Sequence, residues 1–194
     1  MSQKDYSYTS RHIADNPALY EVKRKNTFVF VVTGLSKLVR TGVDEATSES
    51  DYINNVSDII RISCNAVDVP STQSSVISVK RMNGTVKYAS TVDFQELSIT
   101  FDDFIGAETL SALMAWDRLR YDVNKEAVGN ASDYKHDAEL IEYAPDGSTI
   151  IRYWTLKGAW INNLKADSDS YDSTDNAKIS GTVVYDRAIM HMPD

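Results

Sequence analysis

The sequence predicts a mainly β protein: two packed antiparallel sheets, sandwich-like or barrel-like, flanked by one α-helix at 107–123. Apolar and polar residues alternate with a period of two along most of the chain, which is typical of half-buried strands. Turn residues separate pairs of these runs, as in antiparallel hairpins. No break in composition divides the chain. We therefore expect one domain at 18–190, between a flexible arm at 1–17 and a short tail at 191–194.

The alternating pattern indicates roughly seven strands. The first begins at Tyr20 and is apolar on both faces near 29–32, which indicates burial on both sides. A second run at 59–67 alternates Ile60, Ile62, Cys64 and Ala66 with polar residues, and Pro70 ends it because proline has no N–H to donate. The other strands are expected within 75–89 and at 95–101, 138–144, 149–157 and 178–187.

Two turns between strands have clear signals. Asn83-Gly84 lies between two β-type runs and predicts a type I′ hairpin, in which both residues need positive φ angles. Pro145-Asp146-Gly147-Ser148 separates the runs 138–144 and 149–157 and predicts a second hairpin loop.

The segment 107–123 has the helical period. Its apolar side is wide, so the helix is expected to pack against more than one neighbour. Asp117 and Arg120 lie inside this apolar arc, three residues apart. Because an unpaired charge there is costly, we predict that they form an ion pair.

Two polar stretches are expected to be loops. The first, at 36–57, is unusually long for a compact domain, and such loops tend to be functional or disordered. The second, at 165–176, contains four aspartates but fails the EF-hand pattern, because Asp172 stands where glycine is needed and Lys178 where glutamate is needed. A solvated acidic loop is the favoured interpretation, and irregular calcium binding is the minor alternative.

Composition excludes several classes of function. The formal net charge is −8 and the pI about 4.9, so the chain as a whole repels nucleic acid and anionic lipid. The only dense basic run is Lys23-Arg24-Lys25, interpreted as a solvated face. Cys64 is the single cysteine, so no internal disulfide is expected. No apolar run approaches the ~20 residues that span a membrane, and no secretory signal is evident, so we expect folding in the cytoplasm without a membrane partner.

No catalytic constellation stands out. The three histidines, His12, His136 and His191, belong to no metal-binding or catalytic pattern. Phosphate-binding loops and nucleophile elbows are absent from the sequence. The sequence therefore predicts no catalytic residue, no cofactor and no metal, and an enzyme is the least favoured class.

The segment AELIEYAPDGSTIIRYWTLKGAWI at 138–161 resembles a signature of phage tail-tube proteins. In that family a strand and an acidic-Gly turn lead into a strand that ends in a pattern matched here by Trp154-Thr155-Leu156-Lys157-Gly158-Ala159-Trp160. The resemblance covers most of 17–190, although only 138–188 is specific, and it is greatest to contractile-tailed bacteriophages. The residues expected to form the family motif and core are Trp154, Leu156, Trp160 and Trp116.

The resemblance implies that six subunits close a ring and that rings stack into a hollow tube through which double-stranded DNA passes. It implies partners in the tail sheath, the baseplate and the tube terminator, assembly in the host cytoplasm and a place in the tail of the virion. Six copies carry 6 × −8 = −48 charges per ring. An acidic bore repels DNA and lets it slide, so we expect part of this charge to face the lumen.

The loop at 36–57 is the part that the resemblance does not match. We predict that it makes contacts between rings because it is long and polar, and the residues expected to do so are Asp44, Glu45, Glu49, Asp51 and Tyr52. An ornamental surface loop is the competing interpretation.

Three other functions stay open. The chain could be a tube-initiating baseplate protein or the inner tube of a contractile injection system that carries no genome. It could also be a monomeric β-sandwich binding module, which predicts a stable monomer with exposed aromatic residues at loop tips.

Overall fold

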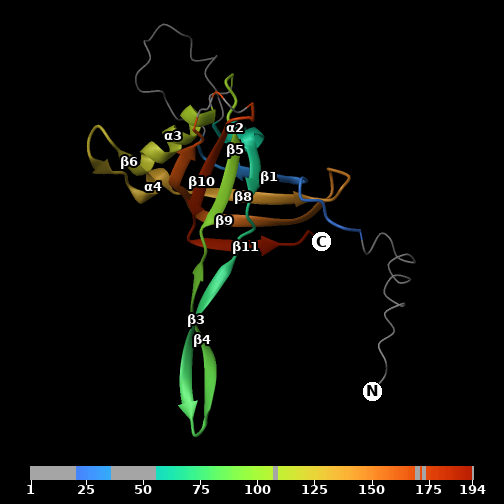
Figure 1. The fold of residues 1–194 in the computed structure, drawn as a ribbon, viewed down its shortest axis with the longest axis vertical. Helices are drawn as coiled ribbons and strands as arrows, with labels where there is room; N and C mark the ends of the chain where they lie inside the picture. The colour runs from blue at the N-terminus through green and yellow to red at the C-terminus, as the bar shows by residue number, and fades with distance from the viewer. Residues whose placement is uncertain (1–20, 36–55, 107–108, 169–170, 172–173, 194) are drawn as a thin grey trace.

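A computed structural model describes residues 21–35, 56–106, 109–168, 171 and 174–193. Most of these residues form antiparallel strands, and helices are few, so the predicted mainly β class is confirmed (Figure 1). No helix in the described part of the chain is both long enough and apolar enough to cross a membrane.

Seven strands form one continuous antiparallel sheet in the order β1-β8-β9-β10-β5-β2, with β11 paired to the free side of β9. Among the described residues, β1 and β2 end this order unpaired to each other, so the sheet does not close into a barrel. The strands are β1 (Phe28–Val32), β2 (Cys64–Val67), β5 (Leu97–Asp102), β8 (His136–Tyr143), β9 (Ile150–Ala166), β10 (Lys178–Val184) and β11 (Arg187–His191).

Strand β9 is shared by two layers. Its first part pairs with β8 and β11, and Leu156 has Ala138 on one side and Ala188 on the other. Its second part, from Trp160 onward, pairs with β10. Gly158 lies between the two parts with a φ of 66°. The two packed sheets predicted from the sequence are therefore joined through one long strand, as in packings where a strand passes from one sheet to the other.

The core lies between the two layers. Alternate residues of each strand point into it: Ala138 and Leu140 from β8, and Leu97, Ile99 and Phe101 from β5. This is the period-two burial that the sequence pattern predicts.

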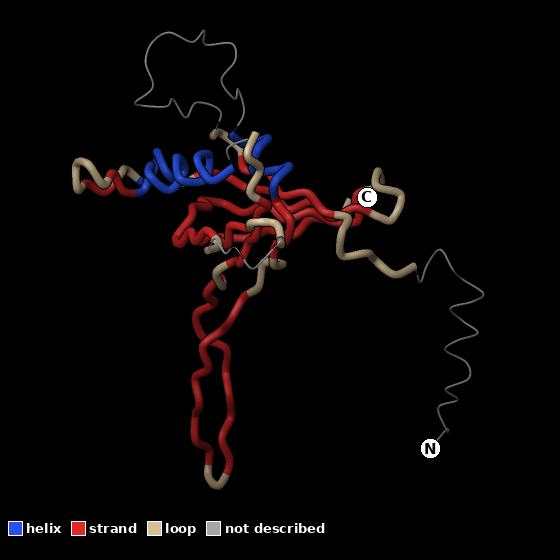
Figure 2. The backbone as a smooth tube through the Cα atoms, turned by 45° about the horizontal axis from the view of Figure 1, so that its top comes forward, coloured by secondary structure: helices blue, strands red, loops and turns tan. Residues whose placement is uncertain are grey.

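The described residues also form three helices, and Figure 2 shows them together on one side of the sheets. They are α2 (Val56–Ser63), α3 (Thr109–Arg120) and α4 (Ala131–Tyr134). Ile60 of α2 and Leu113 and Trp116 of α3 are fully buried in the same core.

The strand predicted at 59–67 is half wrong, because 56–63 is helix α2 and only 64–67 is strand. Val56, Ile59 and Ile60 are buried with the spacing of a helix face, and the Ser63 hydroxyl donates to the Ile59 carbonyl at 2.7 Å. Ile62, which alternation places on the buried face, is 67% exposed. Alternation over a few residues does not distinguish a strand from an amphipathic helix.

Three strand boundaries differ from the prediction. The first strand starts at Phe28, since 21–27 contains no strand. Strand β9 continues to Ala166, into the predicted loop 165–176. The predicted strand 178–187 ends at Val184, and the chain turns there to form β11.

A long two-stranded ribbon projects from the sheet body (Figures 1 and 2). It consists of β3 (Thr72–Arg81) and β4 (Gly84–Phe94), which confirms the predicted hairpin. The turn lies one residue earlier than predicted, since Arg81 pairs with Gly84 across Met82-Asn83. The positive φ of 50° is at Met82 and not at the Asn-Gly pair.

The predicted helix 107–123 is confirmed over its described centre and ends at Arg120. After it, β6 (Tyr121–Asp122) and β7 (Ala127–Val128) form a second, short hairpin. Gly129 closes this hairpin against the end of α3, with its N–H on the Arg120 carbonyl at 2.9 Å. A Cβ there would lie 2.0 Å from the Leu119 carbonyl oxygen, so only glycine fits.

Replacing Gly158 by alanine should destabilise the fold by about 2 kcal/mol, because the positive φ becomes strained. The new Cβ would also lie 2.4 Å from the Asp186 carboxylate, which binds Lys135 at 2.8 Å. We expect the thermal unfolding midpoint to fall by about 4–8 °C. Gly106→Ala, where a Cβ meets no atom within 4 Å, is the control. Equal midpoints for the two variants would show that the bend in β9 does not need glycine.

Candidate assembly surfaces

The described residues contain no group of three or more His, Cys, Asp or Glu side chains placed to hold a metal. Three features stand out instead: a tryptophan cluster between the helices and strand β9, an anchored segment before β1, and the projecting β3–β4 ribbon.

The tryptophan cluster joins α3 and α4 to strand β9. The Trp160 ring meets the Tyr134 ring edge-on at a centroid distance of 5.8 Å, and the Arg120 guanidinium lies 5.7 Å from the Trp160 ring centre. Trp116 is buried and donates its indole N–H to the Tyr134 carbonyl at 3.4 Å. Trp116 and Trp160, two of the predicted motif residues, therefore hold the helical layer on the sheet.

The other two motif residues lie in the first part of β9. Leu156 is completely buried between β8 and β11. Trp154 is partly buried against the core, in register with Leu140 and Met190. Its indole nitrogen is buried and has no hydrogen-bond partner among the described residues.

The structure brings Asp117 and Arg120 together. Arg120 Nη2 and Nε lie 2.8 Å and 3.2 Å from Asp117 Oδ1, and each side chain is about one third exposed. The pair therefore lies at the margin of the core rather than inside it. Its geometry fixes the guanidinium that lies over the Trp160 ring.

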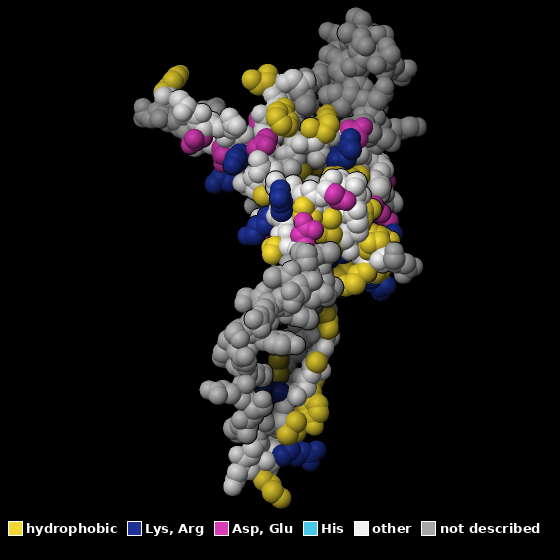
Figure 3. All heavy atoms as spheres, turned by 90° about the vertical axis from the view of Figure 1, so that its right-hand side faces the viewer, with side chains coloured by type: hydrophobic (Ala, Val, Ile, Leu, Met, Phe, Trp, Pro, Cys, Tyr) yellow, Lys and Arg dark blue, Asp and Glu magenta, His cyan; other side chains and the backbone are white. Residues whose placement is uncertain are grey.

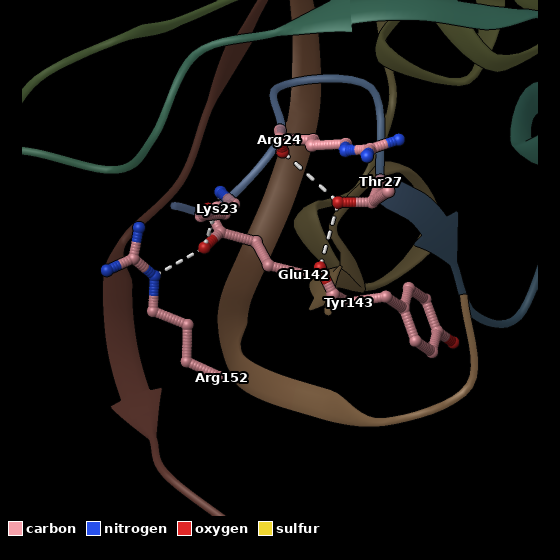
Figure 4. Close-up of polar contacts among 6 residues, drawn as sticks. All are labelled: Lys23, Arg24, Thr27, Glu142, Tyr143 and Arg152. Carbon is pink, nitrogen blue, oxygen red and sulfur yellow. Dashed lines mark hydrogen bonds and ion pairs between the residues drawn. The ribbon is translucent and has the colours of Figure 1, made fainter. Parts of the chain in front are cut away.

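Glu142 of β8 anchors the segment that precedes β1 (Figure 4). Its side chain is 2% exposed, and the carboxylate accepts hydrogen bonds from Lys23 Nζ at 2.7 Å and from Arg152 Nε of β9. Burial acts to raise the pKa of Glu142, but the hydrogen bonds and charges of Lys23 and Arg152 outweigh it and hold the pKa below its ordinary value.

Thr27 fixes the same segment through the backbone. The Tyr143 N–H donates to the Thr27 carbonyl at 2.9 Å, and the Thr27 hydroxyl lies 2.8 Å from the Tyr143 carbonyl and 3.1 Å from that of Arg24 (Figure 4). Residues 23–27 are thus tied to the end of β8, and this sets the direction from which the chain enters the sheet.

Sequence reasoning missed this anchor, because it assigned Lys23-Arg24-Lys25 to a solvated face. A signal for it was present. Glu142 has the same parity as Ala138 and Leu140, so alternation places a carboxylate on the buried face of its strand. A charge in that position needs a partner, and Arg152 is its cross-strand neighbour.

The β3–β4 ribbon is exposed along almost its whole length. Two cross-strand pairs, Ile77 with Tyr88 and Val79 with Val86, place an apolar stripe on one face. Figure 3 shows hydrophobic side chains along the ribbon and basic ones near its tip. The apolar stripe is unusual for a ribbon in solvent, since a two-stranded hairpin is marginally stable alone.

The residues predicted to contact neighbouring rings, Asp44, Glu45, Glu49, Asp51 and Tyr52, lie outside the described residues. Their role stays a prediction.

The fold is shared with chains of contractile injection systems and of the anti-feeding prophage, as comparison with known proteins shows. No protein-family model matches the sequence, and no curated protein matches it. Solved structures do match. A chain of the sheath–tube complex, in the extended state, of an extracellular contractile injection system (PVC) aligns with a TM-score of 0.61 and 16% identity over 98% of this chain and 100% of its own.

Two further structures belong to tube ends. A chain of the anti-feeding prophage cap, which terminates the tube, aligns with a TM-score of 0.60 and 13% identity over 89% of this chain and 92% of its own. A chain of the PVC sheath/tube terminator aligns with a TM-score of 0.56 and 17% identity over 84% and 92%. The likeness is one of fold, and at that level the resemblance to the tube proteins of contractile tails is confirmed.

Replacing Glu142 by glutamine should destabilise the fold by about 2 kcal/mol at pH 7, because Lys23 and Arg152 lose their charged acceptor. The lowered pKa of Glu142 means that its contribution is present above the unfolded-state carboxyl pKa and is lost as pH falls through the folded value. The difference from wild type should therefore shrink toward pH 3, measured by denaturant unfolding across pH. Glu139→Gln, on the opposite face of β8, is the control. A deficit that stays constant with pH would contradict the ionic role of Glu142.

Proposed function

We propose that this chain is a structural subunit of the tube of a contractile tail or injection device. The observation that carries the proposal is the match in fold to a chain of a sheath–tube complex over nearly all of this chain and all of that one. Every structure compared above comes from a multi-subunit assembly of this kind, and this favours a structural role over an enzymatic one.

The open strand edges support self-assembly. Among the described residues, β1, β2 and β11 each have one side without a strand partner. Such edges present unpaired N–H and C=O groups that are either blunted or paired with another chain. Copies that repeat by rotation close a ring, and copies that repeat by translation form a filament. A tube needs both kinds of contact, and this chain has several edges to supply them.

In its finer form, the proposal is that six subunits close a ring, that rings stack inside a tail sheath, and that the tube belongs to a phage tail and conducts double-stranded DNA at ejection. The sheath, baseplate and tube-terminator proteins are then its partners, and the virion tail is its location. The net charge of −8 supports conduction without sticking, provided that part of it faces the bore.

A second candidate is a tube-initiating baseplate protein, or the inner tube of a contractile injection system that carries no genome. The specific observation in its favour is that the matching structures include chains of an extracellular contractile injection system, of a tube-terminating cap and of a baseplate. The two candidates differ in whether particles that contain this chain also contain DNA.

We expect the purified protein to form six-fold rings or hollow tubes in negative-stain electron microscopy as its concentration is raised. Exposed strand edges and the exposed ribbon then find partners in other copies. A particle that stays monomeric in analytical ultracentrifugation at high concentration would overturn the proposal and favour a monomeric binding module.

Deleting residues 43–54 should leave folded monomers or single rings but no long tubes, if Asp44, Glu45, Glu49, Asp51 and Tyr52 make contacts between rings. The circular dichroism spectrum should keep its β signature, because the deletion lies between Leu35 and Val56 and removes no described residue. Tubes of normal length from this variant would refute the predicted role of the loop.

A further inference from the structure

The tip of the β3–β4 ribbon carries the one Asn-Gly step in the sequence, Asn83-Gly84. Met82 and Asn83 are the two turn residues, since Arg81 pairs with Gly84 across them. Residues 81–84 are all exposed, and the Met82 side chain is fully so. Figure 1 shows this tip at the end of the ribbon that is farthest from the sheet body. Solvent therefore reaches the turn freely in the single chain.

An asparagine followed by glycine is open to attack on its own side chain. The backbone nitrogen of the next residue can reach the asparagine Cγ and close a five-membered ring, and glycine has no Cβ to hinder that approach. Asparagine is accordingly one of the heat-labile residues of proteins. Asn83 has the neighbour that this ring closure needs.

The Asn83 side chain is also unrestrained. It makes no hydrogen bond to another described residue. Two other asparagines differ: the Asn65 amide donates to both carboxylate oxygens of Asp102 at 2.9 and 2.8 Å, and that of Asn130 donates to Asp133 at 3.1 Å. Each of these two is followed by alanine. Asn83 therefore combines an unrestrained amide with a glycine neighbour, and the other two have neither.

The backbone of the turn opens easily. Met82 has a φ of 50°, in the left-handed region that favours glycine, so the turn is strained in its closed form. Exposed loop tips open locally at little cost in free energy. Opening breaks the Arg81–Gly84 pair that closes the ladder, and it frees the Gly84 nitrogen to approach the side chain of Asn83.

The single Asp-Gly step of the chain, Asp146-Gly147, is a natural comparison because it is restrained. Its carboxylate accepts hydrogen bonds from the hydroxyls and N–H groups of Thr149 and Ser148, at 2.6 to 3.1 Å. These bonds hold the pKa of Asp146 below its ordinary value and keep the group ionised. A carboxylate anion has no ready leaving group, so ring closure at this step is slow.

We propose that Asn83 is a site of spontaneous deamidation in the folded chain. The Gly84 nitrogen gives its proton to hydroxide and attacks Cγ of Asn83. The new C–N bond closes a succinimide, and the Cγ–Nδ2 bond breaks to release ammonia, which takes its last proton from water. Water then opens the ring at either carbonyl. One opening gives aspartate, and the other gives isoaspartate, in which the main chain runs through the β-carbon.

Either product changes the surface of the ribbon tip. Residues 72–94 contain Lys80, Arg81 and Lys87 against Asp93 and carry +3 − 1 = +2, which deamidation lowers to +2 − 1 = +1. The whole chain changes from −8 to −8 − 1 = −9. Isoaspartate also adds one atom to the backbone of a two-residue turn and so disturbs the pairing that closes the ribbon. This inference does not depend on the proposed function.

Peptide mapping by mass spectrometry tests the site, with folded chain and chain in urea incubated side by side at mildly alkaline pH. The peptide that contains Asn83 should exchange its amide nitrogen for oxygen in the folded chain at a rate within about tenfold of that in urea, because the tip opens at little cost. Peptides that contain Asn65 or Asn130 should stay unchanged over the same time in the folded chain. Labelling by an isoaspartate methyltransferase should detect the second product.

Two variants test the chemistry. Gly84→Ala should slow the reaction about tenfold or more, because a methyl group hinders the attacking nitrogen. The turn tolerates this change, since Gly84 needs no positive φ and the new Cβ lies 3.7 Å from the nearest atom, the Arg81 carbonyl oxygen. Asn83→Gln keeps an amide at the tip but needs a larger ring, so it should not react. Circular dichroism checks that both variants fold as wild type does.

Three outcomes would overturn the proposal. A folded chain that stays intact while the chain in urea reacts would show that the turn protects Asn83. Equal rates for Gly84→Ala and wild type would show that the Gly84 nitrogen is not the attacking group. A reaction spread evenly over the asparagines would show that the tip is not special. The assay uses the chain below the concentration at which copies assemble, so its result leaves the tube function untouched.

Discussion

The fold depends on one strand that belongs to two sheets. Strand β9 gives its first part to β8 and β11 and its second part to β10, so the two layers cannot separate without breaking it. The change of partner occurs around Gly158, where the backbone takes a positive φ and passes close to the Asp186 carboxylate. Asp186 N–H in turn donates to the Lys157 carbonyl at 2.9 Å, which holds the turn between β10 and β11 on the same bend.

This arrangement explains the spacing of the tryptophan motif. Leu156 precedes the bend and is buried between its two neighbouring strands, whereas Trp160 follows the bend and meets the helical layer. A strand of constant twist would keep residues four apart on one face. The positive φ of Gly158 lets Leu156 and Trp160 contact different neighbours, so the motif spans the joint between the two layers.

The sequence predicted secondary structure correctly where buried residues recur with one period over a long segment. The alternation of β5 and β8, the hairpin between β8 and β9, and the helix around Trp116 were all predicted from period and turn chemistry. The errors occur where a short apolar pattern is compatible with both a strand and a helix. Residues 59–63 alternate as a strand does, yet Val56, Ile59 and Ile60 also form one face of a helix, and packing against the core selects the helix.

The candidate surfaces were harder to predict, because they depend on contacts distant in sequence. Asp117 and Arg120 are three positions apart on one helix, and their ion pair was predicted. The anchor at Glu142 joins three segments, and Lys23 lies more than a hundred residues from its acceptor. The ribbon was recognised as a hairpin, but nothing in its alternation shows that it projects from the body. That depends on where the other described elements lie in three dimensions, and none of them covers the ribbon.

The distribution of charge limits how copies of this chain can assemble. Copies that each carry −8 repel one another at long range, and at physiological salt this repulsion is screened beyond about 8 Å. A contact between groups about 3 Å apart is screened far less. The basic residues of β3 and β4 lie on a narrow ribbon away from the acidic body. Two copies can therefore repel each other through their net charges and still attract each other where the ribbon meets an acidic surface. Such a distribution disfavours disordered clustering and favours approach in one orientation, which a regular stack of identical subunits requires.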